Sequence, residues 1–175
     1  MDSNRLFSLR EYKDLTQEEM AGILGVHRVN VSNWENGKEI IPLEKLNLYA
    51  NYFHVSFDYI LGISDVKDSN VKNIDLDKKV IGQNLLQFRK KVHITQEELA
   101  KKLNTTHSTI SAYESGKTLI LTSFLYQIAV MYDVSVDELV GRKWIIYIKC
   151  IFEYLLFKVG IITWILIFTF LFYVL

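Results

Sequence analysis

The chain has 175 residues, 20 basic and 20 acidic side chains, and one cysteine. The lone cysteine excludes an intramolecular disulfide. No apolar core follows Met1, so we expect no N-terminal signal peptide. Charge is unevenly placed, since residues 1–66 hold 6 basic and 10 acidic side chains, 67–141 hold 10 and 9, and 142–175 hold 4 and 1.

One segment occurs twice in the chain. It reads TQEEMAGILGVHRVNVSNWENGK from Thr16 and TQEELAKKLNTTHSTISAYESGK from Thr95. About a third of the positions are identical when residues 6–62 are aligned without gaps on 85–141, and the identities spread over the whole window. This register predicts a duplicated domain. The expected division is a first domain at 1–62, a polar linker at 63–77, a second domain at 78–141 and a tail at 142–175.

Each copy begins a helix with a capping box. Thr16 and Glu19 have the T-x-x-E spacing, as do Thr95 and Glu98. In the first copy a short turn at Gly25-Val26 separates this helix from a second one, expected from about His27 to Asn36. The next glycine of each copy supplies a left-handed helix stop. Segments 42–62 and 122–141 add a fourth and a fifth helix, so the predicted fold class is all-α.

The tail has a different composition. Residues 159–175 contain no charged residue. As a helix this run would be about 25 Å long, near the lower limit for a hydrocarbon core of ~30 Å. The tail's four basic residues all precede it, which by the positive-inside rule places both repeats at the cytoplasmic face of a membrane. The alternative is a buried oligomerisation helix in a cytoplasmic protein.

The repeated helix pair resembles the helix-turn-helix of the lambda-repressor/Cro (XRE) family. This resemblance implies two tandem five-helix DNA-binding domains, in which the second helix of each pair is the recognition helix. As a flexible coil, the linker would span about 20 Å and at most about 43 Å. Because neighbouring major-groove half-sites lie about 34 Å apart, both domains are expected to reach one DNA site.

The resemblance assigns base contacts to the exposed N-terminal part of each recognition helix. Arg28 can contact guanine and Asn33 can contact adenine, whereas the second copy has Ala112 in place of Asn33. His27 departs from the family pattern, which usually has Ser or Thr there, while Thr106 keeps the expected type. The expected base contacts are His27, Arg28, Val29 and Asn33, and Thr106, His107, Ser108 and Ala112.

Phosphate contacts are implied for the first residue of the first helix and for the turn after the recognition helix. They are Gln17, Asn36 and Lys38 in copy one, and Gln96, Ser115 and Lys117 in copy two. Solvated side chains are the alternative for all of them. The pairs Arg10 with Glu35 and Arg89 with Glu114 resemble the family's internal ion pair and are expected to be structural.

The sequence predicts a transcription regulator and no enzyme. Its four histidines have no metal-ligand spacing, and no phosphate-cradling glycine loop or G-x-S-x-G motif is present, so we expect no metal and no cofactor. The expected partners are double-stranded DNA, a membrane through the tail, and either a second copy or the chain's own other repeat. Two alternatives are a helix-turn-helix interaction scaffold that does not bind DNA, favoured by the acidic first domain, and a repressor that oligomerises through its tail.

Overall fold

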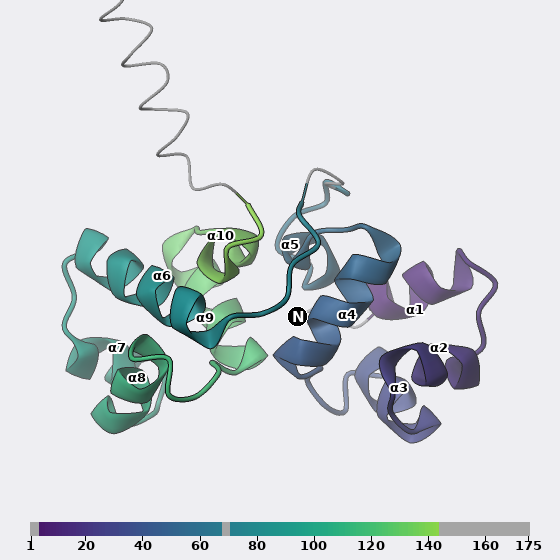
Figure 1. The fold of residues 1–175 in the computed structure, drawn as a ribbon, viewed down its shortest axis with the longest axis horizontal. Helices are drawn as coiled ribbons and strands as arrows, with labels where there is room; N and C mark the ends of the chain where they lie inside the picture. The colour runs from purple at the N-terminus through teal and green to yellow at the C-terminus, as the bar shows by residue number, and fades with distance from the viewer. Residues whose placement is uncertain (1–3, 68–70, 144–175) are drawn as a thin grey trace, which may run out of the picture. The chain divides into compact units, whose positions relative to one another are not determined.

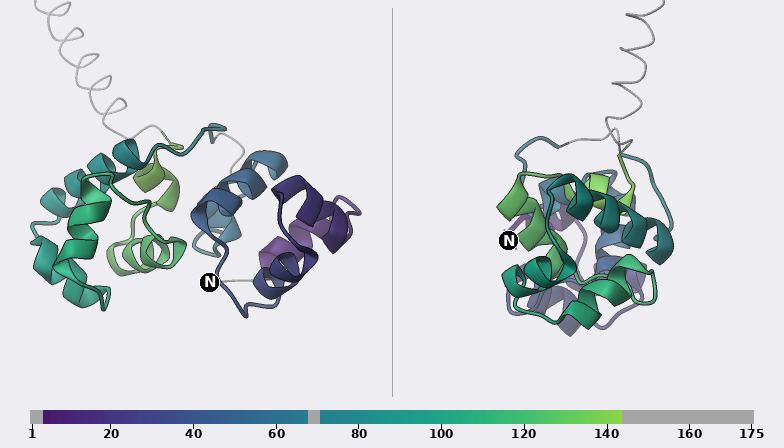
Figure 2. Two further views of the ribbon diagram at one scale, coloured as in Figure 1. Left: turned by 60° about the horizontal axis from the view of Figure 1, so that its bottom comes forward. Right: turned by 90° about the vertical axis from the view of Figure 1, so that its left-hand side faces the viewer.

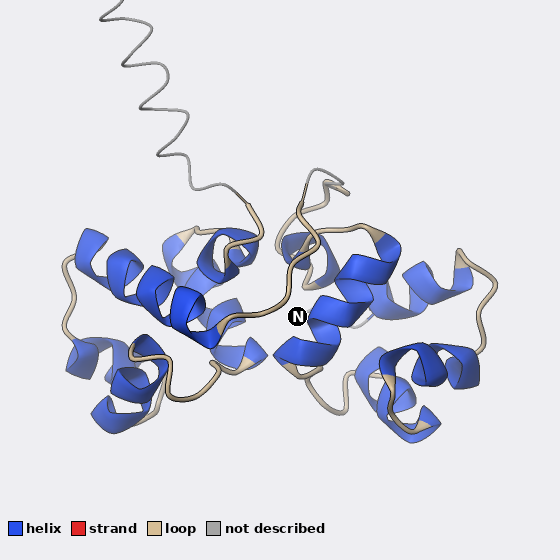
Figure 3. Cartoon of the chain, in the orientation of Figure 1, coloured by secondary structure: helices blue, strands red, loops and turns tan. Residues whose placement is uncertain are grey.

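The computed structural model describes residues 4–67 and 71–143 (Figure 1). Within these ranges all regular secondary structure is helical (Figure 3). Each repeat contributes five helices in the same order, as predicted for an all-α fold. The helices of repeat one are α1 (Asn4–Glu11), α2 (Gln17–Leu24), α3 (Arg28–Glu35), α4 (Leu43–Phe53) and α5 (Phe57–Ile60). Those of repeat two are α6 (Lys78–Lys91), α7 (Gln96–Lys102), α8 (His107–Glu114), α9 (Thr122–Tyr132) and α10 (Val136–Val140).

Both predicted capping boxes form. The Thr16 hydroxyl accepts from the Glu19 amide at 3.2 Å, and the Glu19 carboxylate accepts from the Thr16 amide at 2.7 Å. Thr95 and Glu98 repeat the arrangement at 3.1 and 2.7 Å. The hydrogen bond from the threonine backbone lowers the pKa of each glutamate, because it stabilises the carboxylate. The boxes therefore set where α2 and α7 begin.

Residues with left-handed backbone end the helices around each turn. In repeat one Gly25 ends α2 with φ 62°. In repeat two Asn104 takes the left-handed conformation at the same place, with φ 52°. After the recognition helices, Gly37 and Gly116 have φ 67° and 68°. Gly25 and Asn104 lie between the two helices of each pair, where the left-handed turn lets α2 pack against α3 and α7 against α8.

Apolar side chains make up most of the core between the helices. Leu24, Val31 and Trp34 bury the contact between α2 and α3, and Leu103, Ile110 and Tyr113 do the same in repeat two. Val31 and Trp34 stand three positions apart on α3, as Ile110 and Tyr113 do on α8, so each of these helices has one inward stripe and one solvated side. The stripe fixes how far each recognition helix is rotated and which of its residues face solvent.

Close packing also positions α8. The teal helix α6 lies against α8 (Figures 1 and 2). A Cβ atom added at Gly82 of α6 would lie 2.3 Å from the Tyr113 carbonyl oxygen and 2.8 Å from that of Glu114. Only glycine permits this approach to the C-terminal end of the recognition helix.

The first compact unit extends from Met1 to Lys143, two residues beyond the predicted end of the second domain. Part of the predicted linker contacts repeat one, because the Ile74 carbonyl accepts from Asn47 at 2.7 Å and from Asn51 at 3.4 Å. Residues 144–175, with the predicted tail helix, lie outside the described residues. Across 4–67 and 71–143, none of the helices has the length and apolar character needed to cross a membrane.

Candidate nucleic-acid interface

The first turn of α3 presents its side chains to solvent. His27 is the N-cap residue, with extended backbone at φ −81° and ψ 148°, and its imidazole makes no capping hydrogen bond. Asn30 accepts instead from the His27 amide through Oδ1 at 3.2 Å. His27, Arg28 and Val29 are exposed, while Asn33, one turn later, is partly exposed. Four residues expected to read bases thus lie on or near the accessible side of α3.

The equivalent turn of α8 is capped more conventionally. The Thr106 hydroxyl accepts from the Thr109 amide at 3.2 Å, as expected for a threonine N-cap. Thr106, His107 and Ser108 are exposed, and Ala112 is half-buried. The Thr106 hydroxyl is therefore engaged in its own helix end, and His107 and Ser108 are the polar side chains that repeat two offers beside it.

A chain of hydrogen bonds links the surface of repeat one to its interior. Arg28 donates through Nη1 to the Gln17 side-chain oxygen at 3.0 Å, and Gln17 donates through Nε2 to Glu35 at 2.9 Å. Glu35 in turn accepts from the Arg10 guanidinium at 2.6 and 3.0 Å. The Gln17 amide is thereby held at the N-terminus of α2, beside the first turn of α3.

The ion pair beneath this chain is largely buried. The side chains of Arg10 and Glu35 are 5% and 3% exposed. Glu35 accepts hydrogen bonds from the guanidinium, and this raises the pKa of Arg10. Arg10 also donates to Glu11 and to the Leu15 carbonyl. The pair joins α1 to α3 and fixes the recognition helix on its buried side.

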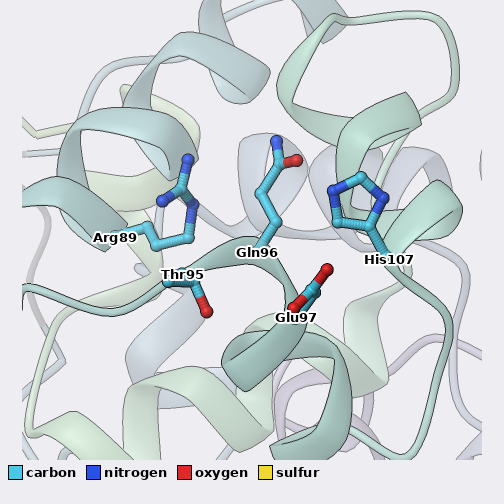
Figure 4. A pocket seen from close by; sticks show the side chains of 5 residues that line it. All are labelled: Arg89, Thr95, Gln96, Glu97 and His107. Carbon is cyan, nitrogen blue, oxygen red and sulfur yellow. The ribbon is translucent and has the colours of Figure 1, made fainter.

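Repeat two has the same glutamine and arginine hydrogen bonds to a buried glutamate, but within residues 71–143 no bond corresponds to the one from Arg28 to Gln17. Gln96 donates to Glu114 at 2.6 Å, and Arg89 donates to Glu114 at 2.6 and 3.0 Å. The Glu114 hydrogen bond raises the pKa of Arg89. His107 occupies the position of Arg28. Figure 4 shows Gln96 between Arg89 and His107 in an open pocket, which Thr95 and Glu97 complete.

The phosphate-binding residues expected in the turns after the recognition helices fall into two groups. Asn36 donates to the Ser32 carbonyl at 2.8 Å, and Ser115 donates to the Ala112 carbonyl at 3.2 Å, so each side chain bonds its own helix end. Lys38 and Lys117 follow the left-handed glycines and are exposed. The two lysines are thus the accessible cations of these turns.

Sequence reasoning did not identify Asn30 or Thr109 as part of the helix start. Both stand three residues after the N-cap, the spacing of the glutamate in a capping box, and Asn30 completes the start of α3 where His27 does not. Residues 4–67 and 71–143 contain no group of three or more His, Cys, Asp or Glu side chains arranged to hold a metal ion.

The sequence model of the Helix-turn-helix family matches residues 6–60 and 85–139. The chain belongs to this family. Its two matches coincide with the two repeats, so it is a tandem helix-turn-helix protein of the XRE type. No solved structure was found to match it.

Three curated relatives are similar to this helix-turn-helix chain. An uncharacterized HTH-type transcriptional regulator, YobD of Bacillus subtilis, is 35% identical over 94 residues, which are 54% of this chain and 76% of the relative. Antitoxin PezA of Streptococcus pneumoniae is 34% identical over 80 residues, 46% of this chain and 50% of the relative. The HTH-type transcriptional activator BcrR of Enterococcus faecalis is 39% identical over 59 residues, 34% of this chain and 29% of the relative.

Proposed function

We propose that this chain is a sequence-specific DNA-binding transcription regulator. The observation that carries the proposal is the exposed first turn of each recognition helix, supported from behind by a buried Arg–Glu pair. Two relatives named as transcriptional regulators support the same function. The helix ends and the side chains that the fold leaves accessible match what major-groove recognition needs.

Repeat one carries the stronger reading chemistry. The guanidinium of Arg28 suits the two acceptors of guanine, and the amide of Asn33 suits the donor and acceptor of adenine. Each such contact contributes about 1–3 kcal/mol of discrimination against the wrong base. Repeat two would read through His107 and Ser108, with Ala112 against a thymine methyl, and therefore with fewer hydrogen bonds.

Contacts to the DNA phosphates would orient both repeats on the duplex. Gln17 and Gln96 stand at the first position of α2 and α7, where the free amides of the helix start favour an anion. Lys38 and Lys117 supply positive charge at the other end of each recognition helix. Since repeat one is acidic overall, these few cations must account for its affinity for phosphate.

A salt series tests the function. The full-length chain, kept in a non-ionic detergent, is titrated with random duplex DNA between 50 and 200 mM salt, conditions in which phosphate contacts lower affinity steeply. We expect log affinity to fall linearly with log salt, and the slope to shrink by about one for Lys38→Ala. A flat line would instead favour the second candidate, a helix-turn-helix scaffold that binds protein and not DNA. The excess of acidic residues in repeat one is the observation behind that candidate.

The tail supplies a second component of the proposal. The charge-free run at 159–175 would anchor the regulator to a membrane, with the repeats on the cytoplasmic side. Flotation of the full chain with lipid vesicles, compared with a chain ending at Lys143, tests the anchor. If the full chain stays with the soluble fraction and forms oligomers that the shorter chain does not, the tail is an oligomerisation helix.

A further inference from the structure

The two repeats exchange reciprocal hydrogen bonds through α5 and α10. Asp58 of repeat one accepts from the Val136 amide of repeat two at 2.7 Å. Asp137 of repeat two accepts from the Phe57 amide of repeat one at 3.0 Å, and from the Asp58 amide at 3.0 Å. Each aspartate therefore binds free amides at the start of the other repeat's last helix.

These contacts link equivalent positions. The repeats are offset by the distance from Thr16 to Thr95, so Phe57 corresponds to Val136 and Asp58 corresponds to Asp137. In a head-to-tail array, two different surfaces would meet. The contact from Val136 to Asp58 would then have no equivalent from Phe57 to Asp137. When residue i contacts j and the copy of j contacts the copy of i, the interface is isologous and has a twofold axis.

The interface is buried and carries paired charges. Asp58 and Asp137 are 4% and 0% exposed, and Arg142 is 0% exposed. Arg142 Nε lies 3.2 Å from Asp137 Oδ1, and Lys143 Nζ lies 3.7 Å from Asp58 Oδ2. Two carboxylates are thus balanced by two cations, and most of their oxygens accept backbone amides, as burial of charge requires.

Arg142 joins the repeats on one side only. Its Nη1 donates to Asn47 at 2.8 Å and to Asn51 at 2.6 Å, both on α4 of repeat one. Its guanidinium lies 4.6 Å from the centre of the Phe57 ring. The equivalent residue of repeat one is Ile63, and both residues donate their amide to the preceding aspartate's carbonyl in the same turn. This asymmetry belongs to two halves of one chain, because two identical subunits would carry the arginine twice.

We propose that the two repeats form an intramolecular pseudo-twofold dimer, through which one chain binds, as a monomer, a DNA site of two unlike half-sites in inverted orientation. The inference rests on the proposed function. A twofold axis between reading units is mirrored by inverted half-sites in the DNA. The half-sites differ because α3 offers Arg28 and Asn33 where α8 offers His107 and Ala112.

A fixed interface also fixes the spacing of the two half-sites. A free linker would allow several spacings and both orientations, since the second domain could rotate to follow the DNA. With the repeats held by Asp58, Asp137 and Arg142, only one register of the duplex presents both grooves correctly. Insertion of about 5 base pairs rotates one half-site by about half a turn away from its reader.

Selection of bound sequences by the full-length chain in non-ionic detergent, followed by native mass spectrometry of the complex, tests the proposal. We expect two different half-sites, inverted, at one spacing, and one chain per duplex. A direct repeat, a single half-site, or a symmetric palindrome with two chains bound would overturn the pseudo-dimer while the regulator function stands. Selection that enriches no sequence would overturn the proposed function together with this inference.

Variants of the interface give a second measurement. Arg142→Ile introduces the residue that repeat one carries, and Asp137→Asn removes one reciprocal acceptor. In each we expect the preference for the selected spacing over a 5-base-pair insertion to fall at least about tenfold, because tethering alone still allows both repeats to bind. Asp65→Asn, at a side chain that is 98% exposed, is the matched control and should keep the preference.

Binding of each isolated half-site shows that a variant is folded. An unchanged spacing preference in an Arg142→Ile or Asp137→Asn chain that still binds both half-sites would contradict the proposal. Should either variant fail to bind the half-sites, the selected motif of the unaltered chain decides the question alone.

Discussion

Arg28 and Gln17 are joined by a hydrogen bond of 3.0 Å, which connects the recognition helix α3 to the first residue of α2. Gln17 is bound in turn to the buried carboxylate of Glu35. The side chain expected to read guanine is therefore positioned by Gln17, which is itself held by the buried Glu35 carboxylate. Such support reduces the freedom that Arg28 would lose on binding.

Replacing Arg28 should change which DNA is chosen. We expect Arg28→Ala to lower affinity for the selected site by about 1–3 kcal/mol and to relax the preference at one base pair. Competition between the selected site and single-base variants measures this. Lys38→Ala is the paired comparison, since loss of a phosphate contact should weaken all sequences about equally. If the Arg28→Ala chain keeps the same preference at every base pair, Arg28 does not read a base.

Breaking the buried pair should destabilise repeat one. Arg10→Ala leaves the Glu35 carboxylate buried without its guanidinium partner, and loss of one member of a buried pair costs about 3–5 kcal/mol. Urea unfolding followed by circular dichroism gives the free energy. Glu11→Ala removes the other carboxylate near Arg10, whose side chain is 54% exposed, and should cost less than about 1 kcal/mol. Equal losses in the two variants would argue against a structural role for the Arg10–Glu35 pair.

Two glycines should respond oppositely to alanine. Gly82→Ala places a methyl group 2.3 Å from the Tyr113 carbonyl oxygen, so α6 and α8 must separate and the unfolding free energy of repeat two should fall by about 1–3 kcal/mol. Gly22→Ala, inside α2, meets nothing within 4 Å and should add about 0.5–1 kcal/mol. Thermal unfolding of both variants tests the pair. An unchanged unfolding free energy in Gly82→Ala would mean that α6 and α8 can accommodate a methyl group between them.

The contribution of Asp137 to folding stability should become more favourable on mild acidification. Burial raises the pKa of Asp137 to about 6, against an ordinary value near 3.9 in the unfolded chain. The folded state therefore holds more protons between about pH 4 and 6, and the Asp137 contribution to the unfolding free energy rises as pH falls from 7 to 5. Burial is the largest cause of this shift and sets its direction. The charge of Asp58 also raises the pKa of Asp137, whereas the Asp58 and Phe57 amides and the Arg142 guanidinium lower it.

The pH effect is measured as the difference between the parent chain and Asp137→Asn across pH 5–7, which cancels the titration of the histidines. If the difference does not change with pH, the Asp137 carboxyl is ionised throughout.

Glu19 and Glu98 affect stability in a different pH range. Their pKa values are lowered in the folded state, so their contribution is present above the ordinary glutamate pKa and is lost at more acid pH.

Much of each repeat was predictable from local sequence. Thr16 and Glu19 identify a helix start because both capping bonds are local, and Gly37 identifies a helix end because few residues accept its φ angle. The reciprocal pair was not found. Asp58 and Asp137 recur at the same position, but each caps a helix of the other repeat, and no local rule predicts a partner so distant in sequence.

Arg142 illustrates the same limit. Its place before an apolar run suggested a cation beside a membrane, whereas the structure buries it completely against α4 and α5. Its partners, Asn47 and Asn51, are neutral residues that precede it by 95 and 91 positions. Charge pattern along the chain therefore could not distinguish a surface cation from one that joins two repeats.

The difference between Asn33 in α3 and Ala112 in α8 has an evolutionary consequence. In a protein built from two identical subunits, one codon change alters both sides of the complex together, and the operator must change twice to follow. In the proposed pseudo-dimer each reading surface has its own codons. Mutation would then change the sequence that one repeat selects while the other repeat keeps its half-site.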